Sequence, residues 1–582
     1  MCGIFALLNN QNCPINIINM EFLKGQSRGP EYSELFSIKN IHSFIGFHRL
    51  AINGYQEKKS NQPFFIDGIY LVCNGEIYNH KHLRKILNVK QKSRSDCEII
   101  IHLYKKYGIE SVLQNIDGVF AFVLIDTIKK KIYVARDPYG VRPLFISSFN
   151  HYTSGKKEDS LIRTQGKQIT TYGIASELKS IVEIGKNYHQ KIQQFEPGCF
   201  ATFKYSIDKK GDNMFTPIEY VTTTCYSMPV KFPSLYLTNY DNILSNVFET
   251  LRSAVKKRVQ NTEREVACLL SGGLDSSIIA AMVKSMHPGD LHTWSIGFKG
   301  SEDLKYAQMV ADHIGTIHHS IEVDEQEFID AIPEVIYHIE SYDTTTVRAS
   351  VGNWLICKKI KEQSDAKVIF NGDGADEVMG GYLYFHKAPD CIAFDKECRR
   401  LLSDIHYFDV LRSDRSISSH GLEARTPFLD RTFVDCYLSI SPQIRCHASN
   451  NKPEKYIIRE AIAKFAPNLL PKSVLHRTKE AFSDGVSKQT RSWYEIIQEY
   501  VKTQFSHIDT TESDILYSFN PYIYNAPKTL EQLYYRDLFC KHFPTLGCDK
   551  TIPYFWMPKF VKNATDASAR TLDIYNKKMK NN

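Results

Sequence analysis

A cysteine directly follows the initiator methionine in the opening stretch MCGIFALLNN, and this position suits nucleophilic chemistry. Removal of Met1 would leave Cys2 with a free α-amino group beside its thiol. The reference pKa of such an amine is about 7.7–8.0 and that of a cysteine thiol is about 8.5, so the amine could deprotonate the thiol near neutral pH. One residue would then supply both nucleophile and base. The alternative is that Cys2 is an ordinary strand residue.

A glycine-rich loop, SGGLDSS at residues 271–277, follows the apolar run EVACLL and precedes a helical pattern. Gly272 and Gly273 allow a tight turn and a close approach of the backbone to a ligand. The hydroxyls of Ser271 and Ser276, with the free N–H groups of the helix start, predict an anion site. The loop lacks the lysine of the G-x-x-x-x-G-K-[ST] motif and instead resembles the pyrophosphate loop of ATP pyrophosphatases. A plain glycine turn is the alternative.

An acidic loop, NGDGADE at residues 371–377, follows a second apolar run, AKVIF. Its closely spaced carboxylates repel one another unless a cation lies among them. Mg²⁺ in proteins takes one or two carboxylates together with phosphate oxygens. We therefore predict that Asp275 and Asp376 hold Mg²⁺ against the phosphates of ATP, with a solvated acidic turn as the alternative. The spacing of a Ca²⁺ loop is absent.

The elements that must position these residues fall into two patterns. Up to about residue 185, short strands such as GIFALL, IYLVCNG and VFAFVLID predominate, with two helical stretches, which predicts stacked sheets covered by helices. Further along, EVACLL, LHTWSIGF, IHHSIEV and AKVIF alternate with helical patterns, which predicts a doubly wound parallel sheet. The part after about residue 380 reads as helical. We predict domains at 1–190 and 238–582, joined by a junction at 191–237.

Composition narrows the class of protein. The chain has 582 residues, 43% hydrophobic and 24% charged, which is enough to bury more than one core. Its net charge of +7 is spread along the sequence, so a nucleic-acid partner is not indicated. No apolar run is long enough for a membrane span, and no signal peptide is recognisable. The dispersed cysteines, with no C-x-x-C pair, predict reduced thiols in a cytoplasmic protein.

Taken together, the motifs resemble those of the glutamine-hydrolysing asparagine synthetases, which have an N-terminal nucleophile domain. The resemblance implies an α/β fold in which an N-terminal nucleophile α/β/β/α sandwich precedes an ATP-pyrophosphatase-type parallel sheet with a helical C-terminal part. The stretches that carry it run along nearly the whole chain: MCGIFALL, RGPE, HRLAING, NGEIYN, SDCE, ARDPYGVRPLF, SELKSI, LLSGGLDSS, GYLYFHKAP, FDVLRSDR, HGLEARTPFLD and RTKEAFSDGV.

The resemblance implies a glutaminase site around Cys2, which would attack the side-chain amide of L-glutamine to give a γ-glutamyl thioester and ammonia. Arg49 would hold the α-carboxylate of glutamine, for which a bidentate guanidinium is well shaped. Asp96 and Glu76 would hold its α-ammonium group. The donors of an oxyanion hole would come from Asn74 and Gly75. The backbone that would line this pocket belongs to Leu50, Ala51, Ile52 and Asn53.

A second implied site adenylates L-aspartate with ATP and Mg²⁺, because transfer of AMP makes the carboxylate an electrophile for ammonia. The products would be L-asparagine, AMP, pyrophosphate and glutamate. Lys479 would meet the phosphates, and Asp409 matches a carboxylate of the same site. The family carries ammonia between its sites through an apolar internal passage. The positions that match nucleotide contacts of the family are Leu269, Ile296, Asn371 and Gly372.

One departure from the family concerns the acidic loop, which usually reads S-G-E-G-S-D-E. Here Asp373 replaces a glutamate important for the adenylate, so the carboxylate lies one methylene nearer the backbone. This leaves open a catalytically silent homologue. A β-lactam synthetase-like enzyme and a tRNA-modifying pyrophosphatase are two rival interpretations, and neither calls for Cys2. A homodimer joined through the N-terminal domain is one arrangement that the resemblance implies.

Overall fold

In the computed structural model the chain divides into two compact units. The N-terminal unit comprises Met1–Met228 and Phe543–Thr551, and the C-terminal unit comprises Pro229–His542 and Ile552–Asn582. The structure describes residues 1–152, 168–206, 217–227, 239–477, 479, 485–487, 491–506, 511, 512, 514, 516, 520–561, 564 and 566–568. Within these ranges no helix has the length and apolar character needed to span a membrane.

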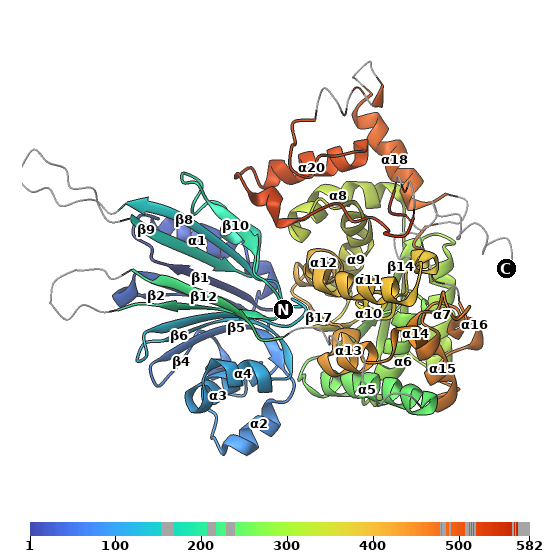
Figure 1. The fold of residues 1–582 in the computed structure, drawn as a ribbon, viewed down its shortest axis with the longest axis horizontal. Helices are drawn as coiled ribbons and strands as arrows, with labels where there is room; N and C mark the ends of the chain where they lie inside the picture. The colour runs from blue at the N-terminus through green and yellow to red at the C-terminus, as the bar shows by residue number, and fades with distance from the viewer. Residues whose placement is uncertain are drawn as a thin grey trace, which may run out of the picture. The chain divides into compact units, whose positions relative to one another are not determined.

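Two six-stranded antiparallel sheets form the N-terminal unit (Figure 1). In spatial order the first sheet contains β10 (Lys191–Gln194), β8 (Phe145–Tyr152), β9 (Gln168–Ala175), β1 (Gly3–Leu8), β3 (Ser43–Arg49) and β2 (Tyr32–Ile38). The second contains β12 (Glu219–Cys225), β11 (Cys199–Lys204), β7 (Lys131–Arg136), β6 (Gly118–Asp126), β5 (Ile69–Ile77) and β4 (Phe64–Ile66).

Alternating side chains on these strands separate two apolar cores. Along β6, Phe120, Phe122 and Leu124 pack under the helices α2 (His80–Leu87), α3 (Ile99–Tyr107) and α4 (Ile109–Asn115), which Figure 1 shows against the second sheet. The residues between them, Val123 among them, face the first sheet. The remaining helix, α1 (Ile15–Leu23), covers the outer face of the first sheet, where Phe22 stacks on His48 at 4.0 Å. The layers are therefore helix, sheet, sheet, helix, as the sequence predicted.

The boundary of the N-terminal unit differs from the predicted domain limits. Residues 191–225, which we assigned to a junction, supply β10, β11 and β12 of its sheets. The segment Phe543–Thr551 also belongs to this unit, although it lies far along the sequence. Its 3₁₀ turn, Cys548–Thr551, contacts β10, and both end residues of the turn are buried. Sequence patterns cannot show such a long-range return of the chain.

The prediction that all cysteines are reduced is wrong for one pair. Cys199 and Cys225 lie directly opposite each other on β11 and β12 and form a disulfide. They are 26 residues apart in sequence, and only the pairing of the two strands brings the thiols together. The other cysteines of the described chain are free.

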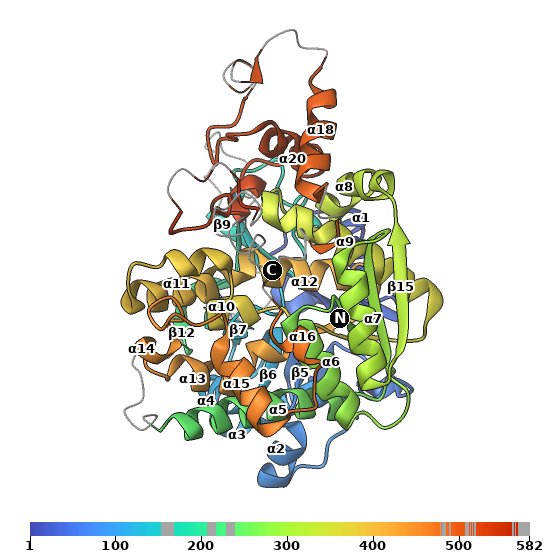
Figure 2. The ribbon, with the colours of Figure 1, turned by 90° about the vertical axis from the view of Figure 1, so that its right-hand side faces the viewer.

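A five-stranded parallel sheet organises the C-terminal unit, in the order β15 (Ile317–Val323), β14 (His292–Phe298), β13 (Val266–Leu269), β16 (Val368–Phe370) and β17 (Glu423–Arg425). Figure 2 shows β15 at one edge with α7 beside it. The helices that accompany the sheet are α5 (Tyr240–Gln260), α6 (Leu274–Met286), α7 (Glu302–Ile314), α8 (Glu325–Ile339), α9 (Thr344–Gln363) and α10 (Ala375–Met379).

The C-terminal part of this unit is mainly helical, as predicted. Its helices are α11 (Cys391–Asp404), α12 (Asp409–Ser418), α13 (Arg431–Leu438), α14 (Pro442–Arg445), α15 (Tyr456–Phe465), α16 (Lys472–Leu475), α18 (Trp493–Gln504) and α20 (Leu530–His542). With the two antiparallel sheets of the first unit and the parallel sheet of the second, the predicted fold class is confirmed.

Candidate active sites

The thiol of Cys2 lies at the start of β1, where the neighbouring strand β3 ends. Gly3 pairs with His48, so the residues after β3 come beside Cys2. The half-buried Sγ donates a hydrogen bond of 3.5 Å to the carbonyl of Leu50. Arg28 Nε donates to the Cys2 carbonyl at 2.9 Å, which fixes the backbone on the other side. The sequence-predicted nucleophile and Leu50 are therefore neighbours.

Asn74 carries an unused hydrogen-bond donor in the layer that also holds Cys2. On β5, Val72 faces the core between the two sheets, so Asn74, two residues further, lies on the same face. Cys2 packs against this core. The Asn74 amide nitrogen is buried and has no hydrogen-bond partner among the described residues. Because buried polar groups are nearly always paired, this donor is a candidate ligand contact.

Arg49 and Glu76 are connected through the loop that follows β3. The Arg49 guanidinium donates to the carbonyls of Asn53 and Gly54 at 3.1 and 2.7 Å. Asn53 Nδ2 in turn donates to Glu76 at 3.0 Å. Asp96, in a 3₁₀ turn at Asp96–Glu98, accepts a hydrogen bond of 2.7 Å from the amide of Ile77, next to Glu76. Arg49, Asn53 and Glu76 thus share one hydrogen-bond network, and Asp96 lies next to it through the amide of Ile77.

The two loops of the second predicted site meet at a reversal in strand order. β13 has β14 on one side and β16 on the other, and in parallel sheets ligands bind at the carboxyl ends of strands at such a point. A Cβ atom on Gly372 would lie only 2.8 Å from the amide nitrogen of Ser276. Glycine at 372 is therefore required for this close packing of the acidic loop against SGGLDSS.

The start of α6 has the features of an anion site. Its N-cap residue is Gly273, and no side chain caps the first amides of the helix. Ser271 and Ser276 lie 3.1 Å apart, hydroxyl to hydroxyl, beside these amides. Gly272 has φ +70°, a conformation that L side chains rarely adopt, so the turn depends on glycine. A phosphate would meet several donors and the positive end of the helix dipole here.

Two lysines and two aspartates form a charge cluster beside this helix start, with Lys455 and Asp275 buried and Asp376 and Lys479 half-buried. Lys455 Nζ lies 2.5 Å from Asp275 Oδ2 and 2.5 Å from Asp376 Oδ1. Lys479 Nζ lies 2.7 Å from Asp376 Oδ2 and 3.9 Å from Asp275 Oδ2. Burial raises the pKa of Asp376, but the two lysines outweigh it and lower that pKa to about 2. Both carboxylates face cations, and Asp376 is ionised at neutral pH.

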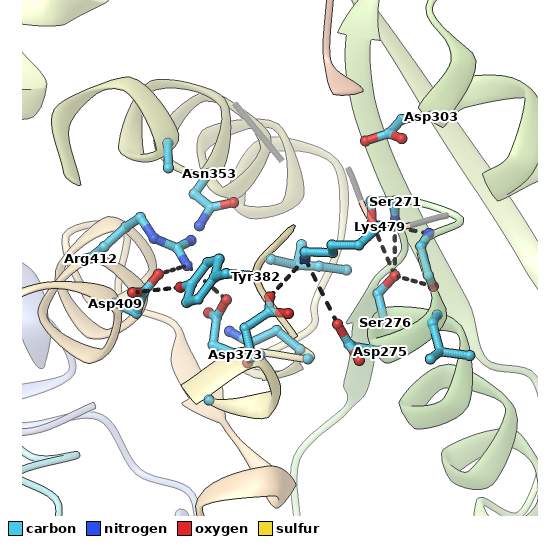
Figure 3. Close-up of a pocket in the computed structure, with 18 of the residues that line it drawn as sticks. Ser271, Asp275, Ser276, Asp303, Asn353, Asp373, Tyr382, Asp409, Arg412 and Lys479 are labelled. Atoms are coloured by element: carbon cyan, nitrogen blue, oxygen red, sulfur yellow. Dashed lines mark hydrogen bonds and ion pairs between the residues drawn. The ribbon is translucent and has the colours of Figure 1, made fainter. Parts of the chain in front are cut away.

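A second charged group surrounds Arg412 on α12. Its Nη2 donates to Asp373 Oδ1 and to Asp409 Oδ1, each at 2.9 Å. The hydroxyl of Tyr382 donates to Glu377 at 2.5 Å, and its oxygen also lies 3.2 Å from Asp409. Burial, together with Asp409 and Asp376, raises the pKa of Glu377 well above its usual range. Figure 3 shows Asp373 and Asp409 both turned toward Arg412.

One cavity of about 240 Å³ connects these groups. The sequence-predicted residues that line it are Leu269, Ser271, Gly273, Asp275, Ser276, Ile296, Asn371, Gly372, Asp373, Asp376, Asp409 and Lys479. Gly272 lies outside the lining and acts through the shape of the turn. Figure 3 shows the cavity from the Arg412 group to the Ser271–Ser276 loop.

Comparisons with known proteins cover both units. The family description "Glutamine amidotransferase domain" matches residues 1–212, and "Asparagine synthase" matches residues 246–393 and 392–537. The asparagine synthetase [glutamine-hydrolyzing] of Homo sapiens is 39% identical over 606 residues, which covers 100% of both chains. The protein of that name from Gallus gallus is 38% identical over 598 residues and covers 99% of both.

The chain belongs to the family of glutamine-hydrolysing asparagine synthetases. Membership makes it a ligase with a glutamine amidotransferase domain ahead of its synthase domain. Among solved structures, an NMN synthetase from Francisella tularensis matches at 10% identity with a TM-score of 0.24, covering 56% of this chain and 99% of that chain. A likeness this weak says nothing about the substrate.

Several cavity residues of this asparagine synthetase family member are not predictable from motif spacing. Lys455 is buried, lies 180 residues from Asp275 and has a left-handed backbone with φ +58°. Arg412 lies within the stretch FDVLRSDR, which was the one signal for it. The C-terminal segment also reaches the cavity, where Trp556, Ala567 and Ser568 form part of the wall. None of these residues belongs to a loop whose spacing alone suggests phosphate chemistry.

The residues that we predicted as Mg²⁺ ligands, Asp275 and Asp376, have a donor set that fits a site shared with phosphate. In the described part of the chain, no group of three or more histidine, cysteine, aspartate or glutamate side chains is arranged to hold a metal ion by itself. Asp275 Oδ1 is nevertheless buried without a hydrogen-bond partner there. Lys455 pairs with both Asp275 and Asp376, so the ionised Asp376 carboxylate lies close to Asp275. Two carboxylates completed by phosphate oxygens are a typical donor set for Mg²⁺.

Proposed function

We propose that this chain converts L-aspartate to L-asparagine with ATP, using ammonia that its own N-terminal unit releases from L-glutamine. The observation that carries the proposal is the presence of two complementary sites in one chain. A thiol at the second position shares a layer with the unpaired Asn74 donor in one unit. A cavity with an anion site, the buried Lys455 and the half-buried Lys479 lies in the other.

In the glutaminase half-reaction, the Cys2 thiolate attacks the side-chain carbonyl of glutamine. The α-amine of Cys2 takes the thiol proton and passes it to the leaving ammonia, which requires removal of Met1. The Asn74 amide and the backbone at Gly75 stabilise the oxyanion of the tetrahedral intermediate. Water then hydrolyses the γ-glutamyl thioester to glutamate and frees the thiol. Arg49 binds the α-carboxylate of the substrate.

The residues that complete the glutamine pocket have the chemistry this binding needs. Glu76 and Asp96 are carboxylates that suit the α-ammonium of glutamine, and Asn53 links Glu76 to the loop held by Arg49. Leu50, Ala51 and Ile52 are buried in the same loop. A charged amino acid is thereby recognised at both of its backbone ends, which leaves the side-chain amide to reach Cys2.

In the synthetase half-reaction, an oxygen of the aspartate β-carboxylate attacks the α-phosphorus of ATP, and the bond to pyrophosphate breaks. Ammonia then attacks the carbonyl carbon of β-aspartyl-AMP, loses a proton, and AMP leaves. Lys479 and Lys455 counter the charge that moves onto pyrophosphate, and the start of α6 binds phosphate oxygens. Leu269 and Ile296, with Asn371 and Gly372, contact the nucleoside.

Mg²⁺ would be held by Asp275 and Asp376, and it would neutralise charge on the pyrophosphate leaving group. The residues of this chain then have separable tasks. Lys455 holds the two carboxylates in place through ion pairs with both. Asp373 accepts the proton that ammonia loses, and its ion pair with Arg412 supports this role by holding the carboxylate in one position. Asp409 shares that arginine and completes the acidic end of the cavity.

The decisive experiment separates the two half-reactions. Cys2→Ala should abolish asparagine formation from glutamine, while formation from ammonium continues with equal release of AMP and pyrophosphate. Cys13→Ala is the matched control, because Cys13 is another half-buried free thiol of the same unit. If folded Cys2→Ala loses both activities, the assignment of two separate sites is wrong. A wild type that makes no asparagine from either source would overturn the proposed function and favour a catalytically silent homologue.

We also propose a subcellular location and an oligomeric state for the protein. As its cysteine usage indicates, the enzyme would act in the cytoplasm, and the resemblance implies a homodimer joined through the N-terminal units. Light scattering of the purified protein measures its mass in solution directly. A mass of 66.9 kDa, that of one chain, would contradict the dimer.

A further inference from the structure

One face of α9 contributes a stripe of residues to the cavity wall. Thr345, Ala349, Asn353 and Ile356 all line the cavity, at intervals of four, four and three residues. This spacing places them one above another on a single side of the helix. Asn353 is flanked by the small Ala349 and the apolar Ile356. Thr346 and Arg348 also line the cavity, and the Arg348 guanidinium is paired with Glu531 and Asp566, so the Asn353 carboxamide is the polar group that the helix presents to the cavity beyond Ala349.

The Asn353 side chain is buried but unpaired. Its residue is only 6% exposed, and no described residue forms a hydrogen bond with its amide. Asparagine is also a poorer helix former than alanine or leucine. The nitrogen and oxygen of this amide are not among the fully buried polar atoms that lack a partner, so they open onto the cavity, where water hydrates them in the free protein. Since Asn353 faces a cavity rather than packed side chains, a bound ligand can supply the missing partners.

The position of Asn353 within the cavity indicates which ligand it meets. Figure 3 shows Asn353 near Arg412, at the opposite end from the Ser271–Ser276 loop and Asp275. The phosphates of ATP belong at the loop end, where the helix start and Lys479 lie. The Arg412 end is then left for the second substrate of the proposed reaction, L-aspartate.

Charge at this end agrees with an amino acid ligand. Arg412 is shared between Asp373 and Asp409, so two carboxylates face one guanidinium. The excess negative charge suits the α-ammonium group of an amino acid and disfavours further phosphate. An amide can donate to a carboxylate and accept from an ammonium group at once, which is what the two backbone ends of aspartate require.

We propose that Asn353 binds the acceptor L-aspartate and is a specificity-determining residue of the synthetase cavity. This inference rests on the proposed function, since it assigns the Arg412 end of the same cavity to the amino acid. It adds a polar contact on α9 to the residues predicted from the two loops. The contact concerns aspartate and not ATP or glutamine.

The test compares Asn353→Leu with wild type in ammonium-dependent synthesis. Leucine has a similar size and favours helix, so the variant should fold and unfold at the same or a higher temperature. The KM for aspartate should rise about tenfold or more, because a hydrogen bond to a charged ligand is lost. The KM for ATP and the glutaminase rate should stay within about twofold. Asn353→Asp adds a negative charge and should raise the KM for aspartate further.

Gln363→Leu is the matched control, since it removes an exposed amide from the end of the same helix. It should leave all three quantities unchanged. An unaltered KM for aspartate in Asn353→Leu would overturn the inference, as would an equal rise in the KM values for aspartate and ATP.

Direct binding separates this inference from the proposed function. Calorimetric titration of aspartate into the full chain, with a non-cleavable ATP analogue present, needs no turnover. Weaker aspartate binding by Asn353→Leu supports the inference even if wild type makes no asparagine. Failure of wild type to bind aspartate at all, or equal binding by both forms, overturns it.

Discussion

Replacing Lys455 by methionine tests how the two carboxylates of the synthetase cavity are held. Methionine keeps a long unbranched side chain but removes the charge that lies 2.5 Å from both Asp275 and Asp376. Of the described lysines, Lys479 then remains beside the two carboxylates, 2.7 Å from Asp376 and 3.9 Å from Asp275. We expect the C-terminal unit to lose stability and synthetase activity while the glutaminase remains.

The size of the effect follows from the pKa of Asp376. Its lowering from 3.8 to about 2 is equivalent to about 2 kcal/mol at neutral pH, at about 1.4 kcal/mol per pKa unit. A lowered carboxyl pKa stabilises the folded state above pH 3.8, and the contribution is lost as the pH falls through about 2. Removing one partner of a buried ion pair costs about 3–5 kcal/mol. Because Lys479 remains, we expect a loss of about 3 kcal/mol.

Tryptophan fluorescence reports this loss selectively, because all four tryptophans, Trp294, Trp354, Trp493 and Trp556, belong to the C-terminal unit. In denaturant unfolding at pH 7, the fluorescence transition of Lys455→Met should therefore have a lower midpoint concentration than that of wild type. Lys452→Met is the control, since Lys452 is exposed and pairs with an exposed glutamate.

Adding Asp376→Asn to Lys455→Met should restore part of the stability, because it removes a carboxylate left without its closest cation. An unfolding free energy equal to that of wild type in Lys455→Met would refute this reasoning. The reasoning would also be refuted if adding Asp376→Asn to Lys455→Met lowered the unfolding free energy by as much as Asp376→Asn lowers it in wild type.

Three further predictions concern other parts of the molecule. Asp373→Ala should lower ammonium-dependent synthesis at least about a hundredfold and Asp373→Glu about tenfold, measured as AMP release, because Arg412 fixes a carboxylate of one length. Asn74→Ala should lower the glutaminase kcat by about a hundredfold with little change in the KM for glutamine, since an oxyanion donor acts in the transition state. Reduction of the disulfide, or Cys199→Ser, should lower the thermal midpoint of the N-terminal unit without changing ammonium-dependent synthesis, which calorimetry and an activity assay check.

The parts of the site that were predictable from sequence lie in loops that directly follow apolar runs. SGGLDSS and NGDGADE each end a strand, and parallel strands bring their carboxyl ends to one edge of a sheet. The sequence therefore placed Asp275 near Asp376 although a hundred residues separate them. The layering of the N-terminal unit was predictable because its strands carry apolar residues on both faces. Successive residues of a strand therefore pack into two different cores, one under the helices and one between the sheets.

Other features depend on contacts that no local pattern encodes. Lys455 enters the cavity from a left-handed residue before α15, where neither helix nor strand periodicity applies. Asn353 lies in a helix that is buried nearly all round, so its orientation toward a cavity has no amphipathic signal. The partnership of Cys199 and Cys225 follows from strand pairing. Each of these required the tertiary fold.

The return of Phe543–Thr551 to the N-terminal unit affects how the protein can be divided. A fragment that stops at residue 228 would lack Cys548 and Thr551, which are buried in the 3₁₀ turn that contacts β10. In such a fragment, the surface of the edge strand β10 that the turn normally covers would be exposed. A chimera that exchanges this part with a relative would have to carry two separate pieces of gene, and a mismatch at the short second piece would appear as instability of the first.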